Sequence, residues 1–134
     1  MKLVLVTPAA KRQARREHLR RRHAAAPPLR QVFPTVQRLQ LELLFRGPGS
    51  TTPPMQSHTR HAAACAFFAF PCPYADCDGQ FDLSTAVTNA VANPVHRTTG
   101  ELQCSGTRIV RMGASELCGL RLDYTVTAAC RPDT

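Results

Sequence analysis

Four cysteines of this 134-residue chain each begin or end a tight turn, and this feature limits the fold more than any other. Proline or glycine follows each of them within two positions, in the stretches CPYADCDG (72–79), CSG (104–106) and CGL (118–120). A tight turn directs backbone amides toward a sulfur atom, and their hydrogen bonds offset the negative charge of a thiolate. The turns therefore favour a site at which several thiolates hold one metal ion. The candidate ligands are Cys72, Cys77, Cys104 and Cys118.

Strand-like sequence flanks these turns, since AFFAF leads to Cys72 and LRLDYTV follows Cys118. Cysteine-bearing turns at the ends of β segments are the arrangement by which a tetrahedral zinc ion joins two hairpins. The pattern resembles the zinc-ribbon class, with four residues between the first two cysteines and thirteen between the last two, where a typical ribbon has two. The resemblance implies one structural Zn²⁺ held by the four cysteines.

Other roles for the cysteines stay open at this stage. They could be unliganded buried thiols, disulfides, or ligands of an iron–sulfur cluster. Cys65 lies in an expected strand and Cys130 in the terminal tail, so neither is assigned to the site. Possible substitute ligands are His58, His61 and His96. No secretory signal is visible after Lys2, which favours a cytoplasmic protein whose thiols stay reduced.

The positive charge of the chain is concentrated near its N-terminus. Residues 1–30 hold nine of the 17 basic side chains and one of the nine acidic ones, so this segment carries the whole formal net charge of +8. A basic segment joined to a neutral body indicates a polyanionic partner. We predict nucleic-acid contacts, to RNA more than to DNA, from Lys11, Arg12, Arg15, Arg16, Arg20, Arg21 and Arg22.

The hydrophobic pattern predicts an α+β protein with a small antiparallel sheet, a zinc-ribbon-like site, one short inserted helix and a basic N-terminal helix. We expect helices over residues 9–26 and 83–93 and strands over 36–45, 62–70, 99–104 and 118–128. The strands 36–45 and 62–70 are expected to form a hairpin across a long loop. A loop tip is expected at 106–113, between the strands 99–104 and 118–128. Leu19 is the only large apolar side chain of the basic helix, which therefore has little to bury. The expected organisation is a basic helical arm and linker at 1–30, a zinc-ribbon-like domain at 31–128 and a tail at 129–134.

The sequence predicts a protein that is not an enzyme. HExxH, GxSxG and a phosphate-binding glycine loop are absent from it, and four cysteines describe a closed metal site. Asp76, Asp78 and Asp82 near the first turn are expected in structural roles. Two function classes remain: a zinc-stabilised protein whose basic arm binds nucleic acid, and an adaptor that docks on an acidic protein surface. No membrane partner and no small-molecule substrate are expected.

Overall fold

The computed structural model describes residues 8–47, 52–111 and 114–131, and it confirms the α+β class. Within these ranges the chain forms three helices and eight strands. The helices are α1 (Pro8–Ala25), α2 (Leu29–Val32) and α3 (Ser84–Ala92). The strands are β1 (Val36–Arg46), β2 (Gln56–His61), β3 (Ala69–Pro71), β4 (Gln80–Asp82), β5 (Arg97–Gln103), β6 (Thr107–Arg111), β7 (Ala114–Leu117) and β8 (Arg121–Cys130). None of the described helices is both long enough and apolar enough to cross a membrane.

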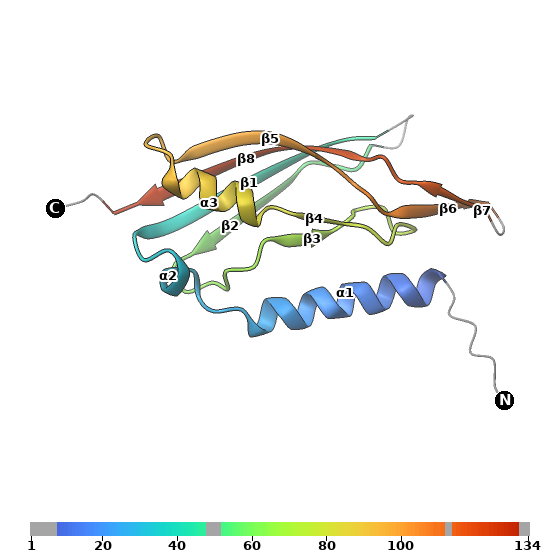
Figure 1. Ribbon diagram of the computed structural model, residues 1–134, viewed down its shortest axis with the longest axis horizontal. Helices are drawn as coiled ribbons and strands as arrows, with labels where there is room; N and C mark the ends of the chain where they lie inside the picture. Colours follow the sequence, from blue (N-terminus) through green and yellow to red (C-terminus); the bar gives the residue numbers. More distant parts are fainter. Residues whose placement is uncertain (1–7, 48–51, 112–113, 132–134) are drawn as a thin grey trace.

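A four-stranded antiparallel sheet, in the order β2-β1-β8-β5, forms the main layer (Figure 1). Leu41 of β1 pairs with Val126 of β8 and Phe45 with Leu122, so the alternate apolar residues of both strands face the same side. All four side chains are at most 4% exposed. The alternation read from residues 36–45 and 118–128 is therefore confirmed, and α3 covers the β5 and β8 part of this face.

The expected hairpin between residues 36–45 and 62–70 is wrong. The partner of β1 is β2, with Leu41 opposite His58. Of the alanine-rich segment only 69–71 is a strand, and it pairs with β4. Small side chains bury little area and do not favour a strand, and residues 62–66 instead hydrogen-bond to 27–30, where Leu29 N donates to Ala64 O at 2.7 Å.

The inserted helix forms as expected but begins at Ser84. Asp82 stabilises its first turn, because one carboxylate oxygen accepts from Ser84 N at 2.9 Å and from Ser84 Oγ at 2.6 Å. Val87 and Ala90 on the inner face are fully buried. The short helix thus closes the core beside β5 and β8.

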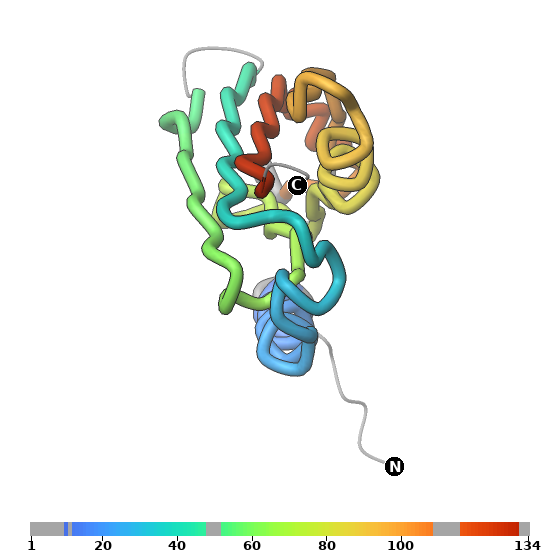
Figure 2. Tube along the Cα trace, turned by 90° about the vertical axis from the view of Figure 1, so that its left-hand side faces the viewer, coloured from blue at the N-terminus to red at the C-terminus, as the bar shows by residue number. Residues whose placement is uncertain are grey.

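Helix α1 lies along the body beside β3, as the side and end views both show (Figure 1; Figure 2). Leu19 is 4% exposed, and His23 stacks on Phe67 with 5.5 Å between ring centroids. Arg12 Nη1 donates to Asp76 O at 3.2 Å. The expectation that the helix has little to bury is thus wrong at Leu19. This buried side chain, the His23–Phe67 stack and the Arg12 hydrogen bond hold the helix on the body.

Candidate metal centre

The four predicted cysteines come together between the small sheet and one end of the main sheet. Cys72 and Cys77 lie in the turn that joins β3 to β4, Cys104 follows β5, and Cys118 precedes β8. Each is between 1% and 4% exposed. The site therefore connects the β3–β4 turn with the end of β5 and the start of β8.

The sulfur atoms of this four-cysteine site have the separations of a single tetrahedral ion. All four Sγ atoms lie within 4.8 Å of one another. Cys72 Sγ lies 3.8 Å from Cys118 Sγ, and Cys77 Sγ lies 3.6 Å from Cys104 Sγ. A zinc–sulfur bond of about 2.3 Å gives a tetrahedron whose sulfur–sulfur edges are about 3.8 Å. The four side chains could therefore hold one metal ion.

Backbone amides two residues after the cysteines point at the sulfur atoms. Gly79 N donates to Cys77 Sγ at 3.3 Å, and Gly106 N donates to Cys104 Sγ at 3.4 Å. Backbone hydrogen bonds at Tyr74 and at Leu120 favour the thiolates of Cys72 and Cys118 in the same way, although the net pKa of both thiols is raised. This repeated hydrogen bond stabilises thiolates at all four positions, as expected from the turn residues.

Burial and hydrogen bonds among the four cysteines oppose the ionisation of all four together. A hydrogen bond from Cys72 lowers the pKa of Cys104 to about 5. The hydrogen bond from the Gly106 amide acts in the same direction, and burial opposes both. Burial raises the pKa of Cys77 to about 12 and also raises that of Cys118. The hydrogen bond to Cys104, together with burial, raises the pKa of Cys72. Without a metal, one thiolate is stable here and four are not; a divalent cation offsets the repulsion.

The thirteen-residue gap between Cys104 and Cys118 is a β-hairpin made of β6 and β7. The expected tip at 106–113 is thus mostly strand, and residues 112–113 lie outside the described residues. This hairpin is joined to the first turn, because Arg108 Nε donates to Asp76 Oδ1 at 3.0 Å and its guanidinium lies 3.8 Å from the Tyr74 ring centroid. The thirteen residues therefore form a hairpin whose base brings Cys104 and Cys118 into the same cluster.

Two glycines allow the two halves of the site to approach each other. A Cβ on Gly79 would collide with Cys104 Sγ, and a Cβ on Gly106 would collide with Gly79 N. Asp78 fixes the same contact, since its carboxylate accepts from Thr107 N at 2.7 Å. Gly119 has a different role: its φ of 65° turns the chain between Cys118 and Leu120.

The remaining candidate ligands lie apart from this cluster among the described residues. Cys65 and Cys130 are half-buried, and all six cysteines are free thiols, so no disulfide is formed. His58 Nε2 lies 3.0 Å from Gln56 Oε1, His96 Nδ1 lies 3.1 Å from Val91 O, and His61 is exposed. An iron–sulfur cluster would hold its cysteines further apart than the observed Sγ separations, because several irons and sulfides lie between them.

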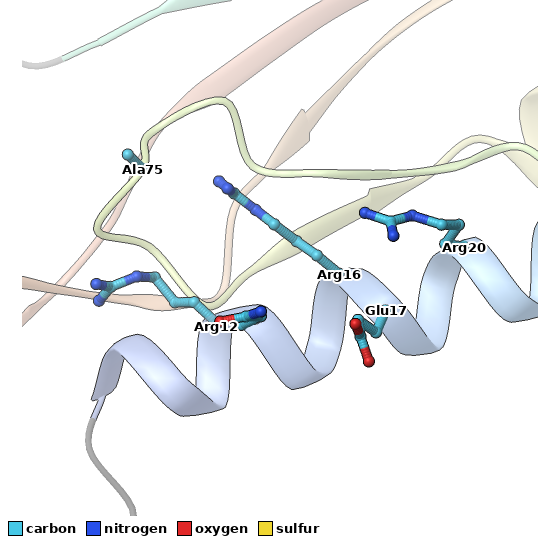
Figure 3. Close-up of a pocket in the computed structure, with 6 residues that line it drawn as sticks. Arg12, Arg16, Glu17, Arg20 and Ala75 are labelled. Atoms are coloured by element: carbon cyan, nitrogen blue, oxygen red, sulfur yellow. The ribbon is translucent and has the colours of Figure 1, made fainter.

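The basic side chains of α1 lie in several different surroundings. Arg12, Arg16 and Arg20 extend from one side of the helix toward the loop that carries Ala75, and the Glu17 carboxylate points away from them (Figure 3). Elsewhere on the helix, Arg21 Nη2 lies 3.6 Å from Glu17 Oε2. The remaining positions are Arg15, beside Asp78; Arg22, whose guanidinium lies 5.3 Å from the Phe67 centroid; and Lys11, whose side chain is outside those described.

Comparison of the chain with models of protein families, with curated proteins and with solved structures gives no match. The residues and their geometry therefore carry the functional argument alone.

Proposed function

We propose that this protein is a non-enzymatic, zinc-stabilised protein of the cytoplasm whose α1 arginines bind nucleic acid, RNA in preference to DNA. The four-cysteine site would hold one structural Zn²⁺ in a zinc-ribbon-like manner. The reducing conditions of the cytoplasm would keep the four cysteines from forming disulfides. The proposal rests on one observation above all: Arg12, Arg16 and Arg20 form a row on one side of a docked helix, with no acidic partner among the described residues.

Zinc is proposed because the ligands are four cysteines in a closed, buried arrangement. A tetrahedral set of four thiolates selects zinc or iron, and a catalytic zinc usually keeps an open position with a water or substrate. All four positions here belong to protein sulfur atoms that are at most 4% exposed. A structural role for the ion follows from this coordination, and Asp76, Asp78 and Asp82 are already used in hydrogen bonds of the fold.

Zinc binding at pH 7 should release about three protons per ion where the turns are folded before the ion binds, and about four where they are unfolded, because thiol ligands bind as thiolates. Of the four, Cys104 with its pKa of about 5 is already ionised, whereas the pKa of Cys77 is about 12 and those of Cys72 and Cys118 are also raised. The affinity should therefore rise with pH across the neutral range and fall in acid. Calorimetry in buffers of different ionisation enthalpy measures the number; release of fewer than about two protons would contradict this charge state.

Nucleic-acid binding is proposed because the α1 arginines are both fixed and unneutralised. Leu19 and the His23–Phe67 stack hold the helix on the body. The single hydrogen bond of Arg12 goes to a backbone carbonyl, which leaves its charge available. Arginines spaced by one helical turn on a rigid support can bind successive phosphates and release the counterions condensed on them.

The test is the salt dependence of binding to a labelled 15-nucleotide RNA. Replacing Arg12, Arg16 and Arg20 by glutamine should weaken binding at least tenfold and reduce the slope of log K against log salt by about 2, since each phosphate contact of a single strand contributes about 0.7. The control variant replaces Arg38, Arg97 and Arg121, exposed on the main sheet, and should lose less than about threefold. Equal losses in both variants, or no binding by the wild type, would refute the proposal and favour the protein adaptor.

A further inference from the structure

A groove separates α1 from the strands β2 and β3. It has a volume of about 320 Å³ and is lined by Arg16, Arg20, His58, Arg60 and Phe70, among others. It continues past Arg16 and Arg20 into a hollow of about 410 Å³ that reaches Arg12 and Ala75 (Figure 3). We call the two together the α1 groove. Because α1 forms only one wall, the groove brings the basic arm and the body into one surface.

Strand β2 presents polar side chains to the groove where a core-facing strand would be apolar. Arg60 pairs with Leu39 and His58 with Leu41, so these polar residues share the face on which the β1 leucines are fully buried. Ser57 and Thr59 occupy the other, exposed face. The inner side of this edge strand is therefore directed at the α1 groove instead of the apolar core.

The charge of the α1 groove is uncompensated. Arg16, Arg20 and Arg60 have no ion-pair partner among the described residues, and Arg60 Nε is buried without a hydrogen-bond partner in the same set. The acid near the opening, Glu17, is engaged with Arg21. A groove with several clustered cations and so little negative charge around it attracts an anionic ligand.

Flat side chains accompany these cations. The His58 ring lies 4.6 Å from the Phe70 ring centroid, and the Arg60 guanidinium lies 6.0 Å from the same centroid. Burial, with the nearby Arg60 charge, lowers the pKa of His58, so its ring is neutral at pH 7. Aromatic rings, histidine and arginine planes are the surfaces on which unpaired bases stack.

We infer that the α1 groove binds single-stranded nucleic acid, with phosphates on Arg16, Arg20 and Arg60 and a base stacked at the His58–Phe70 pair. This deepens the proposed function, on which it rests, by naming the form of nucleic acid and by adding body residues to the site. Arg16 and Arg20 are about 6 Å apart along the helix, a repeat comparable with that of successive phosphates in an extended strand. A duplex keeps its bases paired and would leave the stacking surface unused.

The first test separates the groove from the arm, because Arg60 belongs to β2. Arg60→Gln should weaken binding of a labelled U15 RNA and of dT15 DNA about tenfold, and binding of a 15-base-pair duplex by less than about twofold. Arg38→Gln removes the same charge from the exposed face of β1 and should change none of the three by more than about twofold. The ratio of U15 to dT15 affinity reports which sugar is preferred.

The second test addresses stacking through two histidines on opposite faces of β2. His58→Ala should weaken U15 binding between about fivefold and thirtyfold while the salt slope stays unchanged, and His61→Ala should have no effect. Zinc content and melting temperature confirm that each variant is folded. If each groove variant binds as tightly as its control while the α1 arginine variant still loses binding, the inference is overturned and the proposed function stands. Absence of binding by the wild type would overturn both. Equal competition by polyglutamate would also overturn the inference, since charge alone would then be recognised.

Discussion

Replacing Cys77 by serine should release the metal and remove most of the stability of the protein. The side chain is 3% exposed, and its Sγ lies 3.6 Å from Cys104 Sγ. Serine cannot supply a thiolate, so three ligands would remain around an ion that needs four. Structural zinc contributes an apparent binding free energy of about 10–16 kcal/mol in small zinc domains, which is as large as the whole stability of many domains.

The structure explains why the loss would spread beyond the ligand. The four cysteines join the β3–β4 turn, the end of β5 and the start of β8. The β3–β4 pair has three residues in each strand, and two-stranded pairs of this size are not stable alone. The leucines of β1 and β8 belong to the same buried core as the four cysteines, but none of them is a ligand of the ion. We expect the turns to unfold first and the main sheet to follow at a lower temperature than in the wild type.

The measurement is elemental analysis beside a thermal melt under reducing conditions. The Cys77→Ser variant should purify with less than about a tenth of a zinc per chain and melt at least about 15 °C below the wild type. Cys65→Ser makes the same atomic change at a half-buried cysteine outside the cluster and should keep one zinc. A variant at position 77 that retains full zinc and an unchanged melting temperature would contradict a structural metal site.

The sequence was sufficient for those parts of the molecule in which local pattern and tertiary role agree. The ligand turns are local, because each combines a cysteine with a nearby proline or glycine, and the four came together as predicted. Strands β1 and β8 alternate between apolar and polar residues, and this pattern survived in the sheet. Asp82 before α3 and Pro94 after it limited its length in the same way.

The parts that could not be predicted depend on contacts between distant segments. QSHTRH has no apolar alternation, and it forms β2 because β1 offers a complete row of backbone partners. Its inner polar residues are explained by the α1 groove and not by the core. Of the three phenylalanines at 66–70, Phe68 is buried in the core, whereas Phe67 and Phe70 are half-buried and line the α1 groove. A docked α1, which Leu19, the His23–Phe67 stack and the Arg12 hydrogen bond hold on the body, leaves no periodic signal in the sequence.

Replacing Gly106 by alanine should weaken zinc binding even though residue 106 is not a ligand. A Cβ at this position would collide with Gly79 N, would lie 2.5 Å from Gly79 Cα and would lie 2.8 Å from Asp78 Oδ1. Two of these atoms belong to the backbone beside Cys77, so the collision cannot be relieved by a side-chain rotation. The two turns would have to separate, which also lengthens the hydrogen bond from Gly106 N to Cys104 Sγ.

Separation of the turns acts on the metal because the sulfur tetrahedron is shared between them. Overpacking of this kind costs about 2–3 kcal/mol, which corresponds to between about thirtyfold and about 150-fold weaker zinc binding. Competition with a chromophoric chelator measures the affinity, and the neighbouring exposed Ser105→Ala variant should stay within about twofold of the wild type. Unchanged affinity in Gly106→Ala would mean that the first turn can move away from Cys104 without strain. The close approach of Gly79 and Gly106 would then not be required to hold the four sulfur atoms at metal-binding distance.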